Sequence, residues 1–369
     1  MKRHVFFIMT ALLGIIYFFS GSPTEISDRT MIQAIGIDKT NTGYCVTMQI
    51  FSPEGGGNDT AVDASLPNVS IVNGKGNTVY EAVKECYTEL GGNVFIGQNQ
   101  IFLFGKDIDF SKKDEVFGYF LSTSEAFMNV DCAIAENTAE EILKVPISGN
   151  AVSSEIFSQM IDTAADNGRC IKTSFIDLIE AMESQSKAII MPVISKAEES
   201  KSDSSEETLE SVKLQIDNGA VFTDGKYVCE ITYEQMGDAA ALIGKGNYIF
   251  TDVSYRGITY SKTFKVTDRE VTAKIENNEL LICFDLRVDI KDEKIFANAL
   301  NNDEVSKKAL EEIDSKVQSF ANEISQKRSA ELLNADDYIK RFYPELYKKY
   351  KDNLDVLYDK ARVIVNIDE

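Results

Sequence analysis

Few residues of this chain have the types and spacing that catalysis or metal binding requires. The single histidine is His4, so the rest of the sequence has no Ser-His, Cys-His or His-metal arrangement. The cysteines are far apart and none forms a Cys-x-x-Cys pair, which favours buried free thiols over metal ligands. They are Cys45, Cys86, Cys132, Cys170, Cys229 and Cys283. We therefore expect no metal, no cofactor and none of the common hydrolase mechanisms.

Two short patterns resemble parts of active sites. Gly74-Lys75-Gly76-Asn77 precedes a predicted helix, as a phosphate-binding loop would. The third glycine of a dinucleotide fingerprint is replaced by Val79, and no GxxxxGK[ST] occurs, so we interpret the stretch as a tight turn. The adjacent carboxylates Glu140-Glu141 and Asp336-Asp337 lie near predicted helix starts, where they favour the helix dipole. We predict no catalytic residue.

A local concentration of aromatic and basic residues is the best candidate contact site. The segment Asp337–Lys351 reads DYIKRFYPELYKKYK in a strongly acidic chain. It could face anionic lipid headgroups or an acidic partner protein. The alternative is that its aromatic rings pack inward while its lysines stay in solvent. The residues predicted to touch a partner or the membrane are Tyr338, Lys340, Arg341, Phe342, Tyr343, Tyr347, Lys348 and Lys349.

Composition bounds both the class of protein and its partners. The chain has 369 residues, of which 44% are hydrophobic, enough for two or three domains with real cores. Its formal net charge is −21. A field of that sign repels nucleic acid and polyphosphates, so we expect no nucleic-acid partner.

The N-terminus has the pattern of a secretory signal or a signal anchor. Lys2 and Arg3 precede an uncharged, mostly apolar run, Val5–Phe19. With the two cations on the cytoplasmic side, the body of the chain is expected on the extracytoplasmic side. The alternatives are cleavage after Ser22 and a buried core helix that begins the chain.

The first half of the body alternates strand and helix patterns. Thr78 with Glu81 and Ser174 with Asp177 have the capping-box spacing, which predicts helix starts. The predicted strands are Met31–Ile37, Tyr44–Phe51, Val69–Val72, Ile101–Gly105, Val130–Ala135 and Ile189–Val193. The predicted helices are one from Thr78, then Lys113–Leu121, Ala139–Lys144, Glu155–Ala165 and Phe175–Glu183.

The second half follows a Ser-rich, charged stretch, Glu198–Glu210, which predicts a disordered linker. It is strand-rich and then has one long helix, Asp303 to about Leu333. The predicted strands are Leu214–Ile216, Gly219–Phe222, Tyr227–Cys229, Tyr248–Val253, Thr259–Val266, Val271–Ile275, Leu280–Ile290 and Ala361–Ile367, with a short helix at Tyr233–Met236. Glu276-Asn277-Asn278-Glu279 is a hairpin signal.

Several blocks in order resemble one family. RTMIQAIGIDKTNTGYCVTMQIFSP is similar to the opening of Ger(x)C-type spore germination proteins, the C subunits of GerA-type nutrient germinant receptors. GNTVYEAVKECYTELGGNVFIGQNQIFLFGKDI and NVDCAIAENTAEEILK resemble the family's second and third blocks. Asn218–Phe222 with Lys226–Val228 resembles the start of its second domain, and the closing DYIKRFYPELY is also similar.

The resemblance implies an α+β fold of three mixed domains in tandem, without enzymatic activity. We place a signal or anchor segment at residues 1–23, an N-terminal domain at 24–196, an acidic linker at 197–211, a small β-rich domain at 212–262 and a C-terminal domain at 263–369. The implied function is a non-catalytic extracytoplasmic receptor subunit that assembles with integral-membrane A and B subunits during germination, in a spore at the outer face of the inner membrane.

One departure from the family concerns attachment to the membrane. Members carry a lipobox cysteine just after the signal, whereas here Ser20-Gly21-Ser22 stands in that region and the first cysteine is Cys45. Lipidation in that manner is therefore not expected, and Val5–Phe19 is predicted to remain as the anchor. Two alternative functions are an independent membrane-tethered binding protein and a carboxylate-based cell-surface hydrolase.

Overall fold

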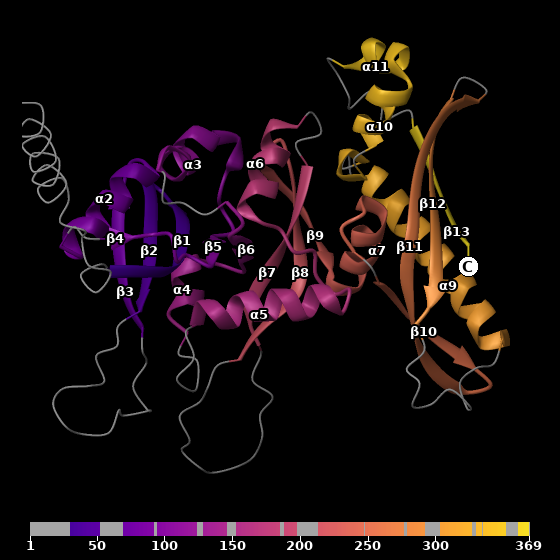
Figure 1. Ribbon diagram of the computed structural model, residues 1–369, viewed down its shortest axis with the longest axis horizontal. Helices are drawn as coiled ribbons and strands as arrows, with labels where there is room; N and C mark the ends of the chain where they lie inside the picture. Colours follow the sequence, from indigo (N-terminus) through magenta and orange to yellow (C-terminus); the bar gives the residue numbers. More distant parts are fainter. Residues whose placement is uncertain are drawn as a thin grey trace, which may run out of the picture.

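A computed structural model shows an elongated molecule in which two β-sheets lie one after the other, each covered by helices (Figure 1). The structure describes residues 30–51, 69–91, 94–123, 128–145, 153–184, 188–197, 213–246, 248–276, 279–291, 303–326, 330–333, 335–351 and 361–368. The expected anchor Val5–Phe19 and linker Glu198–Glu210 lie outside these residues. Within them, no helix is long and apolar enough to cross a membrane.

The first half of the molecule carries the following elements. The strands are β1 (Thr30–Thr40), β2 (Gly43–Phe51), β3 (Val69–Gly76), β4 (Val94–Phe95), β5 (Ile101–Phe104), β6 (Asp131–Ala135), β7 (Ala188–Lys196), β8 (Leu214–Thr223) and β9 (Lys226–Thr232). The helices are α2 (Val79–Glu89), the 3₁₀ turn η2 (Phe110–Lys112), α3 (Lys113–Ser122), α4 (Ala139–Leu143), α5 (Ser153–Asp166), α6 (Phe175–Glu183) and α7 (Tyr233–Ile243).

The second half has one sheet and a long helix. Its strands are β10 (Tyr248–Tyr255), β11 (Ile258–Glu276), β12 (Glu279–Ile290) and β13 (Ala361–Asp368). Its helices are α9 (Asp303–Gln326), the 3₁₀ turn η3 (Ala330–Leu333), α10 (Ala335–Phe342) and α11 (Pro344–Tyr350).

The first sheet is mixed and has the order β3-β2-β1-β5-β6-β7-β8-β9, with β4 paired to β1. Its centre, from β1 through β5 and β6 to β7, is parallel, and both flanks are antiparallel. Parallel strands need crossover connections, which here are the helices. Side chains alternate between two cores because successive residues of a strand point to opposite faces. Ile35 and Phe102 pack with α2, α3 and α6, whereas Ala34 and Leu103 pack with α4, α5 and α7.

The second sheet has the order β10-β11-β12-β13, with only the β12–β13 pair parallel. Helix α9 lies on this sheet and buries Val305, Ile313 and Val317. The Gln318 amide of α9 also satisfies backbone groups of β13. It accepts from the Val365 N–H at 2.8 Å and donates to the Val363 carbonyl at 3.1 Å. These bonds complete part of the outer edge of β13, which pairs with β12 on its other side.

The two sheets share one continuous hydrophobic core. Residues of α5 and α7 belong to the same cluster as residues of β10, β11, β12 and α9. Strands of the expected middle domain divide between the sheets, since β8 and β9 extend the first and β10 begins the second. β7 pairs with β8 although residues 198–212 separate them in the sequence, so the first sheet continues past residue 197. The three domain boundaries themselves stay a prediction.

Most predicted elements are present, and several differ in length. The strand expected at Val69–Val72 continues to Gly76, and the two strands expected between Leu214 and Phe222 are one strand, β8. The two strands expected between Thr259 and Ile275 are one strand, β11, with a register shift after Val266 that accommodates the polar residues between them. The short helix expected at Tyr233 continues to Ile243, because Ala239, Ala240 and Leu242 are buried and Gly244 ends it at φ 76°. The long helix α9 ends at Gln326 and not at Leu333.

Candidate functional site

The basic-aromatic segment, residues 337–351, folds into the two short helices α10 and α11. The break between them falls at Tyr343, whose backbone is not helical, and Pro344 begins α11. Proline suits a first helical position because its fixed φ matches the helix and its missing N–H would be unpaired there. The two helices project from the second half of the molecule, and α10 packs against β11 (Figure 1).

One side of the segment anchors it to the core. Ile339 is fully buried and Tyr347 is 9% exposed. Tyr338, Tyr343 and Tyr350 are half-buried against the same core. Burial also raises the pKa of Tyr338. Most of the rings therefore pack inward, which was one of the two interpretations of the sequence.

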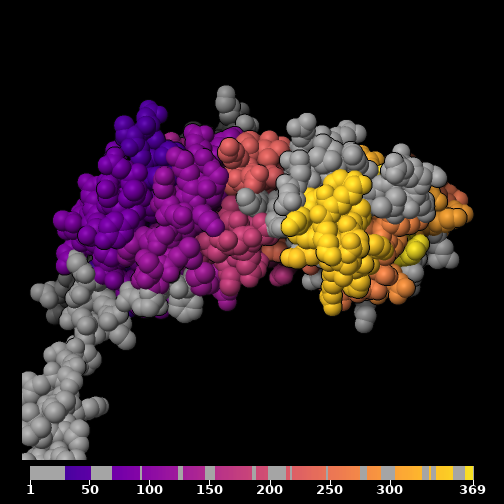
Figure 2. Space-filling view, turned by 90° about the horizontal axis from the view of Figure 1, so that it is seen from above, coloured from indigo at the N-terminus to yellow at the C-terminus, as the bar shows by residue number. Residues whose placement is uncertain are grey.

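The other side of the segment is exposed and cationic. Phe342 is 54% exposed, and its ring centroid lies 4.5 Å from that of Tyr338. Arg341 lies over the Phe342 ring at 5.3 Å and Lys349 over the Tyr350 ring at 5.2 Å. The face that carries this segment is shown in yellow in Figure 2. The exposed basic residues of the two helices are Lys340, Arg341, Lys348 and Lys349, and Lys351 directly after α11 is exposed as well.

This arrangement suits recognition rather than chemistry. Arginine and aromatic side chains are enriched in protein interfaces, and rings held by the core lose little entropy on binding. Lys348 pairs with Glu345 at 2.8 Å, an exposed contact of small energy that a partner's carboxylate can replace. All eight residues predicted from the sequence lie in this segment, but Tyr338, Tyr343 and Tyr347 pack toward the core. Contact of the segment with a partner stays a prediction.

The Gly74-Lys75-Gly76-Asn77 stretch is not the tight turn expected from the sequence. Gly74 and Gly76 belong to β3, and helix α2 packs directly on them. A Cβ at Gly74 would lie 2.1 Å from the Ala82 carbonyl oxygen. The carboxylates of Glu85 and Glu81 accept the backbone N–H groups of Lys75 and Asn77, so these donors are already occupied and do not form a phosphate cradle.

The adjacent carboxylates Glu140-Glu141 serve the start of α4. Glu140 accepts from Asn73 at 2.7 Å and pairs with Lys144, which lowers the pKa of Glu140. The side chains of Asp336 and Asp337 lie outside the described part of the chain. A carboxylate that the sequence did not single out binds the same helix end: Asp38 is buried and accepts from the Ala139 and Glu140 N–H groups at 2.7 and 3.0 Å. Its pKa is raised by burial, an effect that these hydrogen bonds partly offset.

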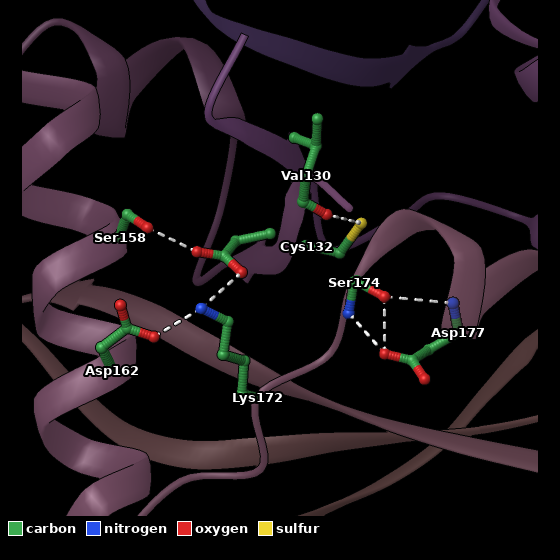
Figure 3. A network of polar contacts seen from close by, with 8 residues as sticks. Val130, Cys132, Ser158, Asp162, Lys172, Ser174 and Asp177 are labelled. Carbon is green, nitrogen blue, oxygen red and sulfur yellow. Dashed lines mark hydrogen bonds and ion pairs between the residues drawn. The ribbon is translucent and has the colours of Figure 1, made fainter. Parts of the chain in front are cut away.

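A second polar cluster joins β6 to α5 (Figure 3). The carboxylate of Asp131, almost fully buried, accepts from Ser158 at 2.6 Å and lies 3.3 Å from the Lys172 ammonium. Lys172 also pairs with Asp162. Each charge has an opposite charge or a donor beside it. The described residues include no histidine, and burial raises the pKa of the neighbouring Cys132 thiol, so the cluster holds the elements together rather than activating a nucleophile.

The cysteines have the surroundings expected from the sequence. None of the six forms a disulfide, and five of them are buried. Burial raises the pKa of Cys86 and of Cys170 to about 12. Because the thiolate is the reactive form, these residues act as small hydrophobic groups. Among the residues that the structure describes, no group of His, Cys, Asp or Glu side chains is arranged to hold a metal ion.

The sequence did not single out Asp238 either. This residue is a buried carboxylate in α7 that lines a pocket between the two sheets. Its position in the sequence could have indicated it, because Asp238 follows Met236 and Gly237 and precedes the apolar run Ala239-Ala240-Ala241-Leu242. An acid within such an apolar run is rarely buried without a reason.

The fold places the chain in the α+β class, and comparisons with known proteins define its family. Residues 22–196 match the model "Spore germination protein N-terminal domain", and residues 217–368 match "Spore germination B3/ GerAC like, C-terminal". Spore germination protein KC of Bacillus subtilis (strain 168) is 24% identical over 355 residues, which cover 90% of this chain and 86% of the relative. The crystal structure of the GerBC protein has the same fold, with a TM-score of 0.54 at 13% identity, covering 90% of this chain and 95% of the other.

The chain therefore belongs to the Ger(x)C family of spore germination proteins. Together the two family models span both sheets of the molecule. Membership supports a role in germination and the receptor-subunit character of the family.

Proposed function

We propose that this protein is a non-catalytic, extracytoplasmic subunit of a membrane nutrient germinant receptor, held at the membrane by Val5–Phe19. It acts by assembling with integral-membrane A- and B-type subunits. The observation that carries the proposal is the match of both halves of the chain, in order, to the two family models.

The exposed cations of the basic-aromatic segment are the surface that we assign to a partner subunit. In a chain of net charge −21, four basic side chains on two adjacent helices form a local field of opposite sign. Such a patch steers association with an acidic surface and fixes its orientation. The inward-packed tyrosines hold the patch rigid, so binding costs little ordering.

The test is an affinity pull-down from sporulating cells in a detergent that preserves complexes. We expect multi-span A- and B-type subunits to be recovered with the wild-type chain. Replacing Lys340, Arg341, Lys348 and Lys349 by glutamine should reduce that recovery at least tenfold. A matched control replaces four exposed lysines elsewhere, Lys84, Lys112, Lys226 and Lys307, and should leave recovery unchanged.

The outcomes separate the function from the surface. Recovery of the wild-type chain alone would contradict the receptor role and favour an independent membrane-tethered binding protein. Equal recovery with both quadruple variants would keep the receptor role and exclude this surface. If the glutamine variant still recovers the subunits but no longer co-sediments with anionic lipid vesicles, the patch binds anionic lipid instead.

A further inference from the structure

A pocket of about 880 Å³ lies where the two halves of the molecule meet. Helix α7, helix α9, strands β10 and β11, and the turn after α5 all contribute to its lining. This volume is in the range of small-molecule sites, which also occur preferentially between structural units. The pocket is separate from the basic-aromatic segment and from the Asp131 cluster.

The carboxylate of Asp238 is the unusual group in this pocket. Asp238 is 1% exposed, and neither of its oxygens accepts a hydrogen bond from a residue that the structure describes. The closest cation, the Lys316 ammonium, is 3.9 Å away and donates to the Phe250 carbonyl at 3.4 Å. Buried carboxylates normally accept several hydrogen bonds, so the acceptor capacity here is unused.

The backbone around Asp238 holds it in place. A Cβ at the preceding Gly237 would lie 2.6 Å from the Gly168 carbonyl oxygen. A Cβ at Gly168 would in turn lie 2.7 Å from the Tyr248 carbonyl oxygen and the Phe250 ring. Helix α7, the turn after α5 and β10 therefore meet at van der Waals distance. Because α7 has no room to rotate or shift there, the carboxylate stays at the pocket wall.

The remaining lining indicates what class of molecule fits. Tyr233, Phe250 and Phe320 contribute aromatic surface, which suits an apolar body. Acidic residues outnumber basic ones along the walls, which disfavours an anion. A metal ion would need several ligands, and the described residues contain no such group.

We propose that this pocket binds a small organic amine as its ammonium ion, with the N–H groups donating to the Asp238 carboxylate and the apolar part resting on the aromatic residues. A primary ammonium ion supplies the hydrogen-bond donors that Asp238 lacks and a second positive charge beside that of Lys316. The inference does not depend on the proposed receptor assembly.

Binding of this kind should be linked to pH. Burial raises the pKa of Asp238 to about 7, while Lys316 partly lowers it and Glu234 raises it further. The other charged groups that line the pocket are Arg169 after α5, Asp252 on β10, Lys262 on β11, and Lys308, Glu311, Glu312 and Glu323 on α9. An ammonium ion pairs with the ionised carboxylate only, so affinity should rise about tenfold between pH 6 and pH 8.

Calorimetric titration of the detergent-solubilised full chain with benzylammonium tests the proposal. We expect one saturable site at pH 8, with affinity about tenfold lower at pH 6. Benzyltrimethylammonium has the same charge and ring but no N–H donor, and it should bind at least tenfold more weakly. Asp238→Asn should weaken benzylammonium at least tenfold and abolish its pH dependence. As a control, Asp114→Asn removes an equal charge from an exposed position of helix α3. It should change neither the affinity for benzylammonium nor its pH dependence.

Three results would overturn the proposal: no saturable binding by the folded wild-type chain, equal affinity for the two ammonium ions, or unchanged binding by folded Asp238→Asn. If that variant does not fold, Lys316→Met provides the second test. Removing the Lys316 cation should move the pH profile of binding to higher pH without lowering the affinity at its plateau. A profile that does not move would exclude Asp238 as the titrating group.

Discussion

Asp238 combines a fully buried position with an ionisable group that has no hydrogen-bond donor among the described residues. Its neutral form is favoured because ionisation in an apolar setting costs desolvation, and the pKa rises to about 7 from the ordinary 3.8. Folding is therefore linked to protonation at this residue. The neutral Asp238 carboxyl contributes stability that is fully present below the pKa of this group in the unfolded chain. That contribution is lost as the pH rises through about 7.

This sign leads to a prediction for Asp238→Asn. The amide of the variant is neutral at every pH, so the variant does not lose the stability that the wild type loses when Asp238 ionises. From pH 5 to pH 8, the free energy of unfolding of the variant should gain about 2–3 kcal/mol relative to the wild type. Denaturant titrations across this range measure the difference. Parallel curves for the two proteins would show that Asp238 does not titrate in the folded state.

At the scale of elements, helix α2 lies so close to strand β3 that their backbones are in contact, with no side chain of β3 between them at the two glycines. Gly74 and Gly76 both lie under the helix, and neither has a positive φ. These two positions require glycine because there is no room for a Cβ atom, and not because the backbone angle is unusual. The same helix buries Val79, Ala82, Val83 and Cys86 on the first sheet.

Gly74→Ala should therefore destabilise the protein by about 3 kcal/mol, since the new methyl group meets the Ala82 carbonyl oxygen and backbone shifts must absorb the overlap. Gly118→Ala in α3 is the matched control. A Cβ there meets nothing within 4 Å, and alanine should stabilise the helix by about 0.5–1 kcal/mol. Thermal and denaturant unfolding measure both. Equal effects of the two substitutions would contradict the close-packing explanation.

At the scale of the whole molecule, the two sheets share a core through α7, so we expect the body of the chain to fold as a unit apart from its N-terminal segment. The described residues begin at Thr30, where β1 enters the centre of the first sheet. We expect the described fold to form without Met1–Phe19.

Removing Met1–Phe19 should therefore abolish membrane association and leave the fold intact. Membrane fractionation in sporulating cells measures the first effect, and circular dichroism with thermal unfolding of the purified chain measures the second. A truncated chain that stays in the membrane fraction would contradict the anchor. Replacing Lys2 and Arg3 by glutamine controls for charge alone and should leave the chain membrane-bound, because the apolar run supplies most of the insertion energy.

Local signals in the sequence determined most elements of this protein. The capping pairs at Thr78 and Ser174 predicted the starts of α2 and α6, and both residues cap those helices. Glu276-Asn277-Asn278-Glu279 predicted the hairpin between β11 and β12. These features depend on neighbours within a few residues, so the sequence carries them directly. The ordered family blocks likewise predicted the family.

Tertiary structure alone decided which elements meet. The sequence placed a linker after Lys196, yet β7 and β8 pair on either side of it, because strand pairing depends on long-range register rather than on chain proximity. The glycines of β3 were interpreted as a turn, since only the position of α2 shows what a Cβ would strike. Asp238 became a candidate site for the same reason: its burial and its distance from Lys316 arise where α7, α9 and β10 converge, and no local pattern encodes that convergence.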